Sequence, residues 1–63
     1  MKFRVDIGET YESGRVVEVT ARTPEDAYKV ASTECRGEEF VQQIFDKQFH
    51  CYYDWMNGFA IYK

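Results

Sequence analysis

One segment of this 63-residue chain has the start and stop signals of a helix, and it lies between regions that have the pattern of strands. Thr23 is a favoured N-cap, Pro24 suits the first helical position, and Asp26 stands where a capping-box acid reaches back to the cap. Gly37 suits the position just after a helix. The pattern predicts a single helix over residues 24–36. One helix covers only part of a sheet, so one sheet face is expected to meet water or a partner.

The region before the helix has the two-residue period of half-buried strands. Apolar and polar residues alternate over residues 3–7, and the alternation can continue to Tyr11. Turn-forming residues 12–14 then lead into a second strand over residues 15–21. Residues 2–21 are therefore expected to form an antiparallel hairpin.

The region after the helix is also β-prone. Residues 38–45 carry apolar side chains on both faces, which suits a strand that is covered on one side and contacts a partner on the other. Residues 46–48 are expected to turn, residues 49–55 to form a fourth strand and residues 59–62 a short fifth. The prediction is an α+β protein of order β-β-α-β-β(-β), with an antiparallel sheet of four to five strands and one helix packed on one face. A chain of this length forms a single domain, residues 1–63.

Six of the eleven aromatic residues fall within the last fifteen positions. The pair Asn57-Gly58 between aromatic runs predicts a hairpin, because both central positions of a type I′ turn need a positive φ. Alternation along the fourth strand gives two sets of side chains on opposite faces. The set expected in the core is Phe49, Cys51, Tyr53 and Trp55. The set expected at a mixed polar and aromatic surface is His50, Tyr52, Asp54 and Met56.

Size, charge and motifs favour binding over catalysis. Eleven acidic and eight basic side chains give a formal charge of −3, which argues against binding nucleic acid through its phosphates. No GxSxG, P-loop, HExxH or GxGxxG pattern occurs. Cys35, Cys51 and His50 do not make a four-ligand zinc set, and the two cysteines are expected to be free thiols. We expect no enzyme activity, no cofactor and no metal site.

The chain is expected to be cytoplasmic and to have no membrane contact. No stretch is long and apolar enough to span a bilayer, and the first residues lack the apolar core of a signal peptide. The surplus of aromatic side chains instead favours a surface that binds a macromolecule, since protein interfaces are enriched in Tyr, Trp, Phe, Met and Arg.

A pattern in the helix and the strand after it has a known counterpart. Its residues are Ala27, Val30, Ala31, Ser32, Glu34, Cys35, Gly37, Val41 and Ile44. This segment resembles small phage anti-CRISPR proteins that inhibit type I-F CRISPR-Cas surveillance complexes, and the coarse order of elements is similar over nearly the whole chain. Such inhibitors bind the repeated backbone subunits of the complex and keep target DNA from the guide, with no catalysis and no cofactor.

The resemblance implies a phage protein that acts in the host cytoplasm as an inhibitor, in a host-virus interaction with a host protein complex. The contact would use the helix and its exit loop, near Lys29, Arg36, Glu38 and Gln42. Interface composition adds candidates from the C-terminal hairpin, which are His50, Tyr52, Met56 and Tyr62.

Three alternatives stay open. A small phage inhibitor of bacterial RNA polymerase shares the acidic strand-strand-helix-strand pattern to a lesser degree. A single-strand nucleic-acid-binding protein would stack bases on exposed aromatic rings, although the basic residues are scattered. A homodimeric structural subunit would bury the bare sheet face in a second copy, so both a monomer and a homodimer are considered.

Overall fold

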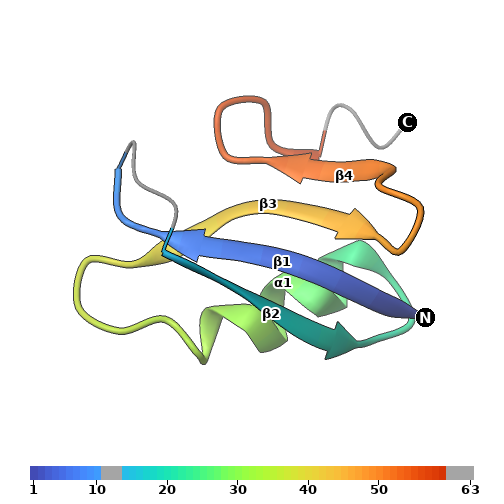
Figure 1. Cartoon of the computed structure of the whole chain (residues 1–63), viewed down its shortest axis with the longest axis horizontal. Coiled ribbons are helices and arrows are strands. Elements are labelled where there is room, and N and C mark those ends of the chain that lie inside the picture. The colour runs from blue at the N-terminus through green and yellow to red at the C-terminus, as the bar shows by residue number, and fades with distance from the viewer. Residues whose placement is uncertain (11–13, 60–63) are drawn as a thin grey trace.

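The computed structural model describes residues 1–10 and 14–59. The elements run in the order β1 (Lys2–Gly8), β2 (Arg15–Thr20), α1 (Pro24–Ser32), β3 (Phe40–Asp46) and β4 (Cys51–Asp54). The four strands form one antiparallel sheet of order β2-β1-β3-β4, and α1 lies behind this sheet in Figure 1. The predicted α+β class, with one helix on one face of an antiparallel sheet, is confirmed. The expected fifth strand falls mostly outside the described residues.

The core lies between α1 and one face of the sheet. Phe3, Val5 and Ile7 are fully buried, because every second side chain of β1 points towards the helix. Ala27 and Ala31 are the buried helix residues at this contact, and their small side chains let the helix backbone approach the sheet. Val19, Val41 and Ile44 complete the buried cluster. Each large side chain buried in this way contributes roughly 1.5–3 kcal/mol.

An aromatic cluster joins α1 to the far edge of the sheet. The ring of Tyr28 lies 5.0 Å from that of Tyr53 and 6.1 Å from that of Phe59, centroid to centroid. Burial, together with the neighbouring Tyr28, raises the pKa of Tyr53 to about 12. The prediction that Tyr53 faces the core is confirmed by this packing.

Helix α1 begins as predicted but ends four residues early, at Ser32. The Thr23 hydroxyl caps the N-terminus by accepting the Asp26 N–H at 3.1 Å. At the other end, backbone N–H groups bond to carbonyls three residues back, with Thr33 donating to Val30 and Glu34 to Ala31. This tighter winding ends the helix.

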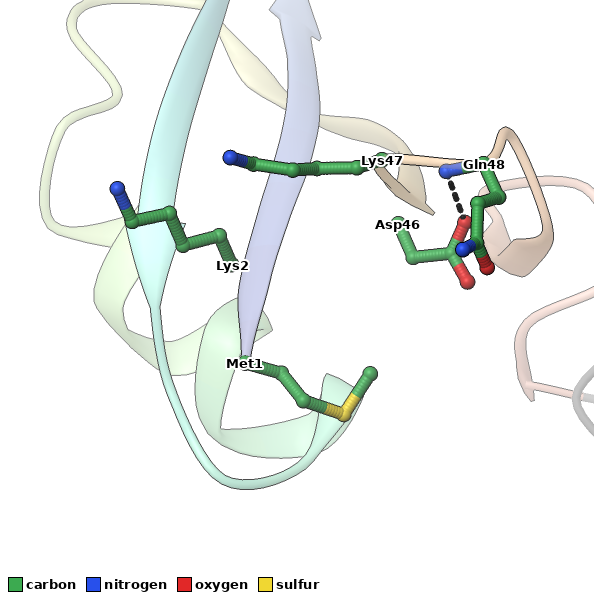
Figure 2. A pocket seen from close by; sticks show the side chains of 5 residues that line it. All are labelled: Met1, Lys2, Asp46, Lys47 and Gln48. Atoms are coloured by element: carbon green, nitrogen blue, oxygen red, sulfur yellow. Dashed lines mark hydrogen bonds between the residues drawn. The ribbon is translucent and has the colours of Figure 1, made fainter.

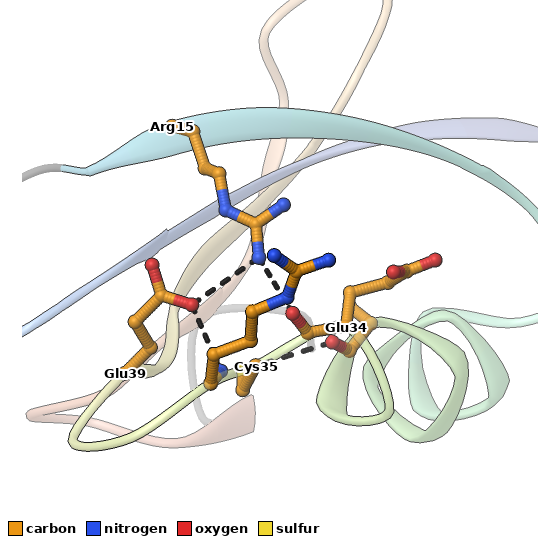
Figure 3. Close-up of polar contacts among 6 residues, drawn as sticks. Arg15, Glu34, Cys35 and Glu39 are labelled. Atoms are coloured by element: carbon orange, nitrogen blue, oxygen red, sulfur yellow. Dashed lines mark hydrogen bonds and ion pairs between the residues drawn. The ribbon is translucent and has the colours of Figure 1, made fainter.

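Arg15 of β2 fixes the loop that follows the helix (Figure 3). Its guanidinium donates to the Glu34 carbonyl and, at 3.2 Å, to the Glu39 carboxylate. The same carboxylate oxygen accepts the Arg36 N–H at 2.9 Å. Hydrogen bonds from Arg15 and Arg36 hold the pKa of Glu39 below its usual value. Gly37 was expected just after the helix; its φ is positive, 59°, but it lies in the turn inside this loop and not at the helix end.

Two bulges change which side chains of β3 and β4 face the core. Asp6 pairs with Gln43 while Ile7 pairs with Val41, so Gln42 is the extra residue of the first bulge. In the second, Ile44 pairs with Tyr53 and Phe45 with Cys51, which makes Tyr52 the extra residue. These two bulges in the strand pairing explain why β3 carries apolar residues on both faces.

The second bulge and the turns before and after β4 correct three predictions for this strand. Phe49 is 69% exposed with φ 66°, so placing it in the core was wrong. It ends the turn of residues 46–49, in which its N–H donates to the Asp46 carbonyl. Trp55 is 36% exposed instead of buried. Tyr52, expected at the surface, is half-buried and packs edge-on against Phe3 with centroids 5.6 Å apart.

The helix cap gives a test of the fold. Thr23→Ala removes the acceptor for the Asp26 N–H, so we expect the free energy of unfolding to fall by about 1 kcal/mol in urea denaturation. Thr23→Ser keeps the hydroxyl and should remain within roughly 0.5 kcal/mol of the natural chain. Equal losses in the two variants would contradict the cap.

Candidate functional site

The turn after β4 presents apolar side chains to solvent. Met56 is 73% exposed, and Trp55 beside it packs edge-on against Phe40, with ring centroids 5.5 Å apart. Phe40 is the first residue of β3 and follows directly on the loop from α1. We call Phe40, Trp55 and Met56 the tip.

Asp54 fixes the backbone of this turn. Its carbonyl accepts the Asn57 N–H at 3.0 Å and the Gly58 N–H at 2.6 Å, and its carboxylate accepts the Met56 N–H at 2.9 Å. Gln43 of β3 donates to the second carboxylate oxygen at 3.3 Å. The chain therefore reverses over residues 55–57, and its geometry is tied to β3.

The turn differs in type from the prediction. Gly58 has φ 64°, but Asn57 does not adopt a left-handed conformation, so the type I′ turn was wrong. The carbonyl of Asp54 selects a longer turn, since it accepts hydrogen bonds from both Asn57 and Gly58. The reversal also lies earlier than predicted, because Gly58 pairs with Asp54 after the turn and is not one of its central residues.

The four candidates predicted near the helix exit differ in their exposure to solvent. Lys29 on α1, with Arg36 and Glu38 in the following loop, is exposed to solvent. Gln42 is only 8% exposed, and its amide donates to the Glu9 carbonyl at 2.7 Å. Three of these side chains are thus available to a partner, while Gln42 holds the end of β1 against β3.

His50 and Tyr52 lie at the opposite end of β3, around Asp46. One Asp46 carboxylate oxygen accepts the backbone N–H groups of Gln48 and His50, at 2.8 and 2.9 Å. The other accepts the Tyr52 hydroxyl at 3.0 Å and lies 2.9 Å from His50 Nδ1. His50 and Tyr52 thus lie near the start of β4, whereas Met56 lies in the turn after its end, so these candidates are not gathered around one feature. Tyr62 lies outside the described residues.

The Asp46 carboxylate is strongly stabilised in its charged form. Burial opposes ionisation, but the hydrogen bonds from His50, Tyr52 and Gln48 outweigh it and lower the pKa of Asp46 to about 2. The adjoining hollow has a volume of about 200 Å³. In Figure 2 the Lys47 side chain that lines it extends away from this carboxylate. Asp46 orients the exposed imidazole of His50. The four contacts of the Asp46 carboxylate nevertheless serve mainly to stabilise the turn.

The two cysteines are free thiols, and both are half-buried. Burial raises the pKa of the Cys35 thiol, which lies 3.7 Å from the Ala31 carbonyl. The Cys51 thiol donates to the Tyr53 carbonyl at 3.3 Å. Within residues 1–10 and 14–59, no group of three or more His, Cys, Asp or Glu side chains is placed to hold a metal ion.

The sequence predicted Met56 as a candidate but did not reveal that Phe40 packs against Trp55 in the tip. The sequence did contain a usable signal, which was the aromatic Phe40 at the start of a predicted strand, close to the charged Arg36 and Glu38. Comparison with family models, curated proteins and solved structures gives no match. No helix among the described residues has the length and apolar character needed to cross a membrane.

The Asp46 turn predicts a pH-dependent stability. Because the folded-state pKa is about 2, below the ordinary 3.8, Asp46 stabilises the fold above about pH 4, and this contribution is lost as the pH falls through about 2. We expect Asp46→Asn to be less stable than the natural chain at neutral pH, with the difference closing in acid, in urea unfolding at several pH values. The exposed Glu38→Gln serves as a control and should show no such convergence. A difference for Asp46→Asn that is constant with pH would contradict the assignment.

Proposed function

We propose that this chain is a non-catalytic binding protein that docks on a protein partner through the tip. The observation that carries the proposal is the 73% exposed Met56 on a turn whose backbone is fixed by Asp54. An apolar side chain on an ordered turn loses less conformational freedom on binding than one on a flexible loop. Methionine and aromatic residues are also enriched at the centres of protein interfaces.

Charged residues precede Phe40 of the tip in the loop from the helix. Arg36 and Glu38 are exposed in the loop that leads to Phe40, and they provide both signs of charge. A polar rim around an apolar centre is the usual composition of a protein interface. The small tip favours insertion into a pocket of the partner, where a few buried side chains carry most of the binding energy.

The partner that we propose is a repeated backbone subunit of a type I-F surveillance complex, so that the chain acts as a steric anti-CRISPR inhibitor. The support for this finer proposal is the residue pattern over 27–44 that resembles such inhibitors. The exposure of Lys29, Arg36 and Glu38 is compatible with the contact that the resemblance implies. Steric inhibition needs no catalytic group and no cofactor.

A DNA-binding assay tests both levels of the proposal. Purified type I-F surveillance complex should lose binding of its target DNA when the protein is added in excess, as measured by gel mobility shift. Met56→Ala should weaken this inhibition by roughly tenfold or more, the effect of losing an interface anchor. Val16→Ala, which shortens an apolar side chain that is 61% exposed on β2, is the matched control and should inhibit normally.

The outcomes separate the two levels. Unchanged DNA binding with excess protein would reject the surveillance complex as partner. Full inhibition by Met56→Ala would reject the tip. Tight binding of single-stranded oligonucleotides that weakens steeply with salt would instead favour the nucleic-acid alternative.

A further inference from the structure

The sheet face turned away from α1, which we call the open face, carries charges in an ordered arrangement. Pairing across β2, β1 and β3 places Glu18, Arg4 and Phe45 in one row of this face. The next row contains Val16, Asp6 and Gln43. Arg4 and Asp6 thus lie two residues apart on the inner strand β1, both directed away from the helix.

Neither of these two charges has an ion-pair partner among the described residues. The Arg4 guanidinium lies over the Phe49 ring, 5.5 Å from its centroid. The Asp6 carboxylate is half-buried, and burial raises its pKa. By contrast, Lys2 on the same strand pairs with Glu18 at 3.7 Å. Two unpaired opposite charges on one sheet face are a pattern that a second surface can satisfy.

We propose that the open face binds a second copy of this chain in a symmetric face-to-face dimer, with Arg4 of each copy over Asp6 of the other. A two-fold axis that lies between the sheets, perpendicular to β1 at Val5, exchanges positions 4 and 6. Each Arg4–Asp6 contact is then made twice, as such an axis requires. Two sheets packed in this way keep their strands nearly aligned, about 10 Å apart.

The surroundings of Asp6 provide room for the incoming side chain. A hollow of about 260 Å³ borders Asp6, and its other lining residues are Gly14, Arg15 and Val16. The positive charge of Arg15 is offset there by its 3.2 Å contact with Glu39. The dimer would also cover the exposed side chains of Phe49 and Val16, which adds apolar burial to the ion pairs.

The area of the open face determines how strongly the dimer is expected to form. The molecule measures 28 by 21 Å across its two longer axes, so a full face offers on the order of 600 Å² per copy, below the roughly 800 Å² of a standard interface. We therefore expect a dimer that forms at micromolar concentrations and weakens with salt. Its two tips point to opposite ends. The dimer uses the open face and does not depend on the proposed function of the tip.

Charge reversal tests the dimer by sedimentation equilibrium at low salt. Arg4→Glu and Asp6→Lys each place like charges opposite each other twice, so each variant alone should dimerise at least about tenfold more weakly than the natural chain. An equimolar mixture of the two should regain dimerisation, because the substituted side chains then face each other and one natural Arg4–Asp6 contact is kept. The double variant Arg4→Glu/Asp6→Lys should also dimerise.

Lys29→Glu makes the same change of charge as Arg4→Glu, but at an exposed position of α1. It should leave dimerisation unchanged. Circular dichroism establishes that each variant is folded. A natural chain that stays monomeric up to millimolar concentration would overturn the proposal. Dimerisation that is insensitive to both reversals, or folded variants that fail to associate when mixed, would overturn it as well.

Discussion

The packing of Ala27 and Ala31 onto the sheet is the contact on which the rest of this structure depends. These two small side chains are fully buried, and they bring a nine-residue helix close to the buried apolar residues of β1, β2 and β3. A helix of this length covers one face of the four-stranded sheet. The second face and the turns at the strand ends are therefore not covered by the helix, and both proposed binding surfaces use these uncovered regions.

The parts of the fold that sequence predicted correctly are those set by local chemistry. The alternation in β1 and the cap at Thr23 each involve residues within a few positions of one another, so their patterns are visible in the chain. The helix end was missed because Arg15, nineteen residues before Glu34, holds the exit loop. The faces of β4 were missed because a bulge at Tyr52 is decided by pairing with β3. Neither interaction leaves a periodic signal.

The candidate site was predicted in composition but not in arrangement. The surplus of aromatic residues and the exposure of Met56 agree with a binding surface near the C-terminal turn. The turn type, the partnership of Trp55 with Phe40, and the inward use of Gln42 all depend on contacts between strands distant in sequence. Similarly, Phe49 was assigned to the core by alternation, although the turn at Asp46 directs it outward beside Arg4. Spacing alone cannot distinguish a strand residue from the end of a tight turn.

The two proposals place two binding surfaces on one small chain, the open face for a second copy and the tip for a protein partner. Hydroxyl-radical footprinting of the protein alone, over a range of concentrations, tests this most directly, because Phe49 reports on the open face and Met56 on the tip. The account predicts that oxidation of Phe49 rises on dilution while oxidation of Met56 stays constant. Oxidation of Phe49 that does not change with concentration, or that changes in parallel with Met56, would contradict it.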